Sequence, residues 1–82
     1  MKFEWDPEKE RLNIRKHAVT FEQAAYVFSD PCVLNQYDDQ HSQEADRWVL
    51  LGKCLSEILL VVMHTYWHDD NSELVKINKD VR

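Results

Sequence analysis

The chain has 82 residues, enough for one domain with a modest core, and no run approaches the roughly 18 apolar residues of a membrane helix. Its start lacks the apolar stretch of a signal peptide, so we expect a cytoplasmic protein without a membrane anchor. The formal net charge of -5 argues against a protein built only to bind nucleic acid, because phosphate contacts require basic side chains.

The chain opens with a predicted strand that leads directly into a helix. Residues Lys2–Trp5 alternate polar and apolar side chains, as a half-buried strand does. Asp6 suits the N-cap of a helix over Pro7–Lys16, since proline is tolerated at the first helical position. Leu12 is the clearest inward residue of this helix.

A second predicted helix follows a capping box over Thr20–Gln23, in which the Thr20 hydroxyl and the Gln23 amide bond each other's backbone N–H groups. Its apolar stripe comprises Phe21, Ala24, Ala25 and Phe28. Val19, just before the cap, is expected to act as a hydrophobic staple. Asp30-Pro31 ends the helix, because the residue before proline avoids the helical conformation.

The rest of the chain is typical of strands. The predicted segments are Cys32–Tyr37, Arg47–Lys53, Ile58–Met63 and Leu74–Ile77. The order β-α-α-β-β-β and the short connections predict an α+β fold: an antiparallel sheet with two helices packed on one face. The sequence does not indicate the pairing partner of the first strand.

Several landmarks occur together in one order and spacing: Phe3–Pro7, Asn13, Lys16–Ala24, Val27-Phe28, Asp30-Pro31, His41-Ser42, Glu44, Arg47-Trp48, Gly52 and His64-Thr65. This series resembles the BrnT toxin family over about residues 2–66. The resemblance implies a single toxin domain over residues 1–82 with a RelE-like fold. It also implies a ribonuclease toxin of a type II toxin–antitoxin system, which cleaves RNA by 2′-hydroxyl attack without a metal or another cofactor. The implied partner is a BrnA-like antitoxin, in a toxin homodimer or a toxin–antitoxin heterotetramer.

Two departures from the family pattern bear on activity. Ala18 replaces the usual glycine after Lys16-His17, which is a mild change unless the position needs a positive φ. The segment Val75–Arg82 stands where the family has R-I-I-S-A-R and a basic helical tail, so we expect that tail to be short or absent. An attenuated ribonuclease is one interpretation. The alternative is a non-catalytic binding module of the same fold, whose acidic residues in 18–46 engage a basic antitoxin-like partner.

The candidate catalytic residues are Arg47, His41 and Glu44. If the loop before Arg47 folds over the sheet, an imidazole, a carboxylate and a guanidinium can converge on one phosphate. The competing interpretation is a solvated loop in which Arg47 pairs with Asp46 or Glu44.

The candidate RNA-binding residues are Lys16, His17 and Lys53. Lys16 and His17 end the first helix, where cations are also favoured by the helix dipole alone. Lys53 shares the strand face of Arg47, but lies about 20 Å away along a straight strand. It can therefore join the same groove but hardly the same phosphate.

No metal site is predicted. His64 and His68 are four residues apart on a predicted strand, a span of about 13 Å that is too long for one ion. A metal-dependent hydrolase is therefore disfavoured. Cys32 and Cys54 lack metal-site spacing and are expected to be reduced thiols. Among the tryptophans, only Trp67 is expected to be exposed and able to stack on a base.

Overall fold

The computed structural model describes residues 1–41, 46–68 and 73–82. Its elements are β1 (Lys2–Glu4), α1 (Pro7–His17), α2 (Phe21–Val27), β2 (Leu34–Tyr37), the 3-10 helix η1 (Asp39–His41), β3 (Trp48–Lys53), β4 (Leu59–His68) and β5 (Glu73–Val81). The predicted α+β class is confirmed. All five predicted strand segments form strands, so the order contains one more strand than β-α-α-β-β-β.

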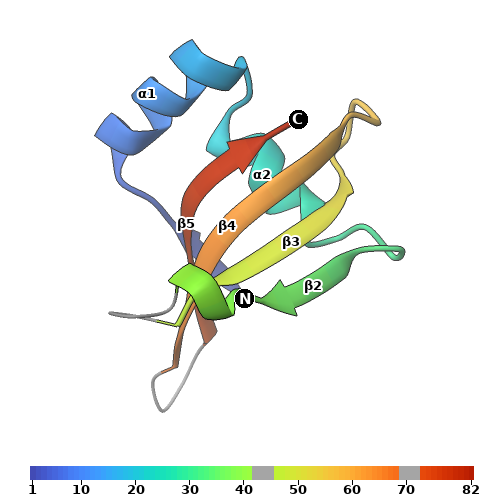
Figure 1. Ribbon diagram of the computed structural model, residues 1–82. Helices are drawn as coiled ribbons and strands as arrows, with labels where there is room; N and C mark the ends of the chain where they lie inside the picture. Colours follow the sequence, from blue (N-terminus) through green and yellow to red (C-terminus); the bar gives the residue numbers. More distant parts are fainter. Residues whose placement is uncertain (42–45, 69–72) are drawn as a thin grey trace.

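The five strands form one sheet in the order β1-β5-β4-β3-β2 (Figure 1). Neighbours from β2 to β5 pair antiparallel, whereas β1 pairs parallel with β5, with Phe3 opposite Val75. The sheet is therefore mixed, and the prediction of a purely antiparallel sheet was wrong for β1. The pairing partner of β1 is β5, at the other end of the chain, and no pattern in the sequence near β1 indicates this pairing.

Helix α1 lies beside β5 at the edge of the sheet rather than on the face that α2 covers (Figure 1). Its N-terminus forms as predicted, with Asp6 Oδ1 accepting from the Glu8 N–H at 2.9 Å. The predicted inward residue was wrong: Leu12 is 52% exposed, and the buried residue is Asn13. Asn13 Oδ1 accepts from the Asp80 N–H at 3.1 Å, and its Nδ2 donates to Asp80 Oδ1. β1 does not extend along this part of β5, so the Asn13 amide supplies the hydrogen-bond partner that the Asp80 backbone N–H needs.

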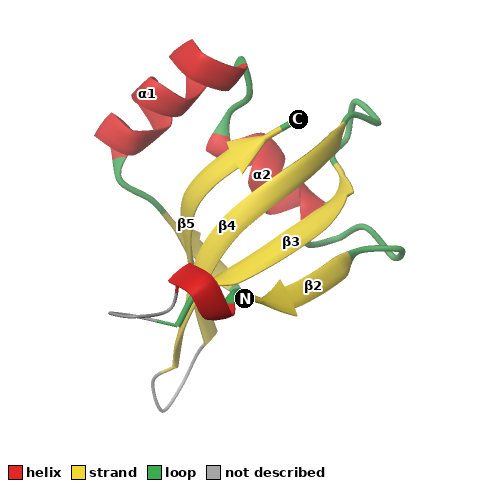
Figure 2. Cartoon of the chain, in the orientation of Figure 1, coloured by secondary structure: helices red, strands yellow, loops and turns green. Residues whose placement is uncertain are grey.

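Helix α2 packs behind the sheet, as Figure 2 shows, and supplies the core. The predicted capping box is present, with Thr20 Oγ1 accepting from the Gln23 N–H at 3.1 Å and Gln23 Oε1 from the Thr20 N–H at 2.7 Å. The buried core comprises Val19, Phe21, Ala24, Val27, Leu50, Cys54, Leu60, Val62, Val75 and Ile77. Gly52 of β3 packs against the end of α2, and an added Cβ would meet Val27 Cγ1 at 2.9 Å.

A β-bulge in β5 determines to which face of the sheet the last side chains of this strand point. His64 is opposite Ile77 and Met63 is opposite Lys79, so Asn78 is the extra residue. The bulge shifts the alternation by one position. As a result Asp80 points to the α2 side, where it is fully buried, and Lys79 points to the opposite face.

Ala18 ends α1 in the left-handed conformation, with φ 57° and ψ 30°. We expect Ala18→Gly to raise the free energy of unfolding by about 0.5–1 kcal/mol, because glycine adopts this conformation without a Cβ clash. Urea unfolding measures the change. The control is Ala25→Gly inside α2, which is expected to destabilise by about 1 kcal/mol. An Ala18→Gly variant that is less stable than the parent would contradict the expectation.

Candidate functional site

One face of the sheet is covered by α2, and neither α1 nor α2 covers the other face (Figures 1 and 2). Successive side chains of a strand point to opposite faces. Leu50, Leu60 and Val62 are buried on the α2 side, so Val49 and Met63 point to the other one. We call this second side the open face.

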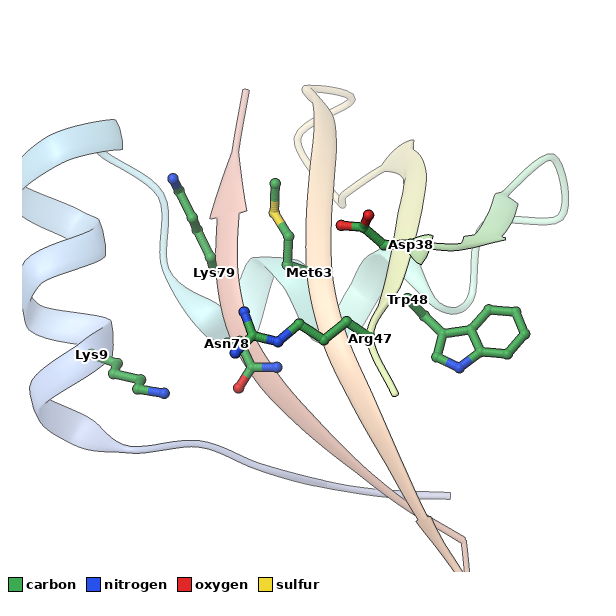
Figure 3. Close-up of a pocket in the computed structure, with 7 residues that line it drawn as sticks. All are labelled: Lys9, Asp38, Arg47, Trp48, Met63, Asn78 and Lys79. Carbon is green, nitrogen blue, oxygen red and sulfur yellow. The ribbon is translucent and has the colours of Figure 1, made fainter. Parts of the chain in front are cut away.

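A cavity of about 340 Å³ lies on the open face between α1 and the sheet. The described residues that line it, drawn in Figure 3, are Lys9, Asp38, Arg47, Trp48, Met63, Asn78 and Lys79. Arg47 extends from the start of β3 across β4, and Lys9 reaches from α1 toward the same space (Figure 3). Because Lys9, Arg47 and Lys79 bring positive charge from three separate elements, we call this cavity the cationic pocket.

A different structural feature positions each of these side chains. The Asp38 N–H donates to the Arg47 backbone carbonyl at 2.8 Å, which sets the two residues opposite each other at the end of the β2–β3 pair where the connecting loop begins. The bulge places Asn78 and Lys79 in the lining, and Asn78 Nδ2 donates to Thr65 Oγ1 at 3.1 Å. Lys9 lies in the first turns of α1, one residue before Glu10.

Glu10 links the two helices. Its Oε2 accepts from the backbone N–H of Phe21, the first residue of α2, at 2.9 Å. The carboxylate therefore caps the second helix as well as belonging to the first. This contact and the Asn13–Asp80 pair fix the orientation of α1, and with it the approach of Lys9 to the pocket.

The predicted RNA-binding residues at the end of α1 line a second cavity of about 240 Å³. It is lined by Lys9, Leu12, Asn13, Lys16, His17, Asn78 and Lys79, three of which also line the cationic pocket. Lys16 and His17 thus extend the same groove along α1. His17 Nε2 is buried without a hydrogen-bond partner among the described residues.

Among the other predicted site residues, Lys53 does not line the cationic pocket. Lys53 lies at the far end of β3 and lines a separate cavity of about 320 Å³ with Asp30, Cys54 and Leu55. His41 is the last residue of η1. Glu44 lies outside the described residues. The roles predicted for His41, Glu44 and Lys53 stay predictions, whereas Arg47 does line the pocket.

Sequence reasoning missed Lys9, Asp38, Asn78 and Lys79 as site residues. Lys9 carried a weak signal, since five of the ten Lys and Arg residues lie in the first 16 positions. Lys79 carried none, because the bulge that turns it to the open face is a property of strand pairing.

His64 belongs to the core and not to the pocket. It is fully buried on the α2 side, with its ring 4.8 Å from the ring of Phe28 and 4.9 Å from that of Tyr66. Burial lowers the pKa of His64, which favours the neutral imidazole.

No group of three His, Cys, Asp or Glu side chains within the described residues is able to hold a metal ion. Trp67 is 52% exposed, as predicted, and both cysteines are free.

Comparisons with known proteins identify the kind of protein that carries this pocket. The family model described as "Ribonuclease toxin, BrnT, of type II toxin-antitoxin system" matches residues 5–77. The chain belongs to this BrnT family. The predicted membership is thereby confirmed, and so is the function class of a ribonuclease toxin in a type II toxin–antitoxin system. A type II toxin implies an antitoxin partner.

A structural comparison supports the fold of this BrnT family member. The crystal structure of the Brucella abortus ribonuclease toxin BrnT, at 1.1 Å resolution, matches with a TM-score of 0.65 and 23% sequence identity. The match covers 99% of this chain and 94% of that one. No curated protein matches the chain. Within the described ranges, no helix is long and apolar enough to cross a membrane.

Proposed function

We propose that the chain is an endoribonuclease whose active centre is the cationic pocket. The observation that carries the proposal is that Lys9, Arg47 and Lys79, from three different parts of the chain, line one cavity of about 340 Å³. An RNA phosphate is the ligand that such a set of cations suits best. The net charge of -5 does not oppose this, because the basic side chains are concentrated where RNA would lie.

The proposed reaction is the attack of a ribose 2′-hydroxyl on the adjacent phosphorus. The O2′–P bond forms and the P–O5′ bond breaks, which leaves a 2′,3′-cyclic phosphate and a 5′-hydroxyl. Asp38 presents a carboxylate in the pocket that can accept the proton of the 2′-hydroxyl. His41, three residues further on, is the second candidate for this base.

Cations act on the two charges that develop in the transition state. The Arg47 guanidinium suits the non-bridging phosphate oxygens, because its planar fork donates two parallel hydrogen bonds. The ammonium group of Lys9 or Lys79 can donate the proton that the leaving 5′-oxygen takes up. We propose a reaction without a metal ion, since three side-chain cations repel a divalent cation and already supply its charge.

The experiment compares Lys79→Ala with Lys53→Ala. Both lysines point to the open face, but only Lys79 lines the cationic pocket. We expect Lys79→Ala to reduce single-turnover cleavage of an RNA oligonucleotide by about 100-fold, because a donor to the developing charge is lost. Lys53→Ala is expected to affect RNA binding at most, and to leave the single-turnover cleavage rate at saturating protein within about twofold of the parent. EDTA is expected to leave the rate of the parent unchanged.

Two outcomes would contradict the proposal. Equal losses in Lys79→Ala and Lys53→Ala would point to diffuse charge along the sheet instead of one centre. Absence of RNA cleavage by the purified free chain, if that chain still binds an antitoxin, would favour the non-catalytic binding module. The antitoxin is proposed to be BrnA-like and encoded beside the toxin.

A further inference from the structure

The open face carries a continuous apolar row outside the pocket. Leu34 of β2 is opposite Leu51 of β3, Leu51 is opposite Val61 of β4, and Val61 is opposite Val81 of β5. We call these four residues the apolar stripe. Leu34 is 66% exposed and the other three are partly exposed. Large contiguous apolar patches on a protein surface mark interaction sites, so this one raises the question of what covers it.

The stripe adjoins the cationic pocket. The neighbouring row on the same face runs from Val49 to Met63 to Lys79, two residues along each strand from the stripe. Met63 and Lys79 line the pocket. A segment that covers the stripe therefore comes within about 7 Å of the pocket, the rise of two strand residues.

The charges of the open face as a whole are mainly positive. Among the described strand residues and their flanks, the open face presents Lys2, Arg47, Lys53, Lys76 and Lys79, against the acids Glu4 and Asp38. This balance is the reverse of the net charge of -5 of the whole chain. A partner with Asp or Glu beside its apolar residues would match this surface.

We propose that the apolar stripe is the docking surface for a segment of the antitoxin that has aliphatic residues flanked by acidic ones. Such a segment would bury Leu34, Leu51 and Val61 and place carboxylates against the cations of the pocket. If the pocket is the active centre proposed above, the docked segment excludes RNA from it, so binding and neutralisation are one event.

Other occupants fit the surface less well. A second copy of the chain, related by a two-fold axis through the stripe, would place its own Lys and Arg side chains near those of the first copy. These like charges would repel each other. RNA bases stack on aromatic or guanidinium planes, whereas the stripe consists of Leu and Val side chains.

The test measures the affinity of the purified toxin for the protein encoded beside its gene, by isothermal titration calorimetry. Leu34→Asp is compared with Leu55→Asp, a matched change at a leucine that is 74% exposed and lies off the stripe. We expect Leu34→Asp to weaken binding by about tenfold or more, and Leu55→Asp to stay within about twofold. Thermal unfolding verifies that both variants are folded, and hydrogen exchange of the complex is expected to show protection in β2 and β4.

The cleavage rate of the free toxin separates this proposal from the proposed function. Leu34→Asp is expected to cleave RNA like the parent, and the binding result stands even if the parent cleaves nothing. Equal affinity in both variants, with protection on α2 instead, would overturn the proposal. So would a loss of RNA cleavage without a loss of antitoxin binding, which would assign the stripe to RNA. A dimer of the free toxin that Leu34→Asp dissociates would assign it to a second copy.

Discussion

Replacing Arg47 by alanine is expected to reduce RNA cleavage by about 100- to 1000-fold and to abolish growth arrest on expression. Arg47 is the residue that both the sequence and the cavity single out, and its side chain is exposed, so truncation leaves the core intact. The loss is expected in the cleavage step and less in RNA binding, because Lys9 and Lys79 still attract the phosphate.

Two companion variants sharpen this result. Arg47→Lys keeps the charge but loses the planar fork, and is expected to recover only a small part of the rate. Arg11→Ala removes an arginine of α1 that pairs with Glu8 at 3.0 Å and lines none of the cavities described above. It is expected to cleave like the parent. Growth arrest that survives Arg47→Ala would remove Arg47 from the mechanism and return the catalytic role to the loop that carries His41 and Glu44.

Much of the fold could be predicted because its helices are marked by local signals. Asp6 and the Thr20–Gln23 capping box each act within a few residues of their own position, and each does what the sequence indicates. The end of α2 was placed less well, because the helix stops at Val27, before Asp30-Pro31 is reached. The parallel pairing of β1 with β5 joins the two ends of the chain. No pattern within either strand specifies such a partner.

Only the part of the candidate site that lies next to a strand recognisable from the sequence was predicted. Arg47 precedes a recognisable strand, so its place could be inferred. Lys79 reaches the pocket through the β5 bulge, and Lys9 reaches it through the docking of α1 at a sheet edge. The same docking explains why Asn13 is buried and Leu12 is exposed, against the usual preference of a helix for an apolar inner face.

Asp80 is expected to make the stability of the protein depend on pH. The side chain is fully buried, and one carboxylate oxygen has no hydrogen-bond partner among the described residues. Burial raises the pKa of Asp80 to about 7 from 3.8, opposed by the hydrogen bond from Asn13 and assisted by the nearby charge of Glu10. The folded protein therefore holds a proton that the unfolded chain releases.

The sign of the effect follows from this difference. The contribution of Asp80 to stability is complete below about pH 4, declines as the pH rises, and is lost above about pH 7. Asp80→Asn is neutral at every pH and keeps an oxygen for the Asn13 amide. We expect the variant to resemble the parent at pH 4.5 and to exceed its free energy of unfolding by roughly 2–4 kcal/mol at pH 8.

Urea unfolding at both pH values measures the difference in free energy of unfolding between Asp80→Asn and the parent. Other titrating groups, His64 included, are present in both proteins, so their contributions cancel in this difference. Asp39→Asn, at an exposed position in η1, is the control and should give the same small difference at both pH values. If Asp80→Asn also gave equal differences, Asp80 would titrate normally and the buried proton would be excluded. A confirmed effect would extend to the pocket, because the Asn13–Asp80 contact holds α1, which carries Lys9, against β5. Charging Asp80 at alkaline pH would then weaken the support of one of the three proposed catalytic cations.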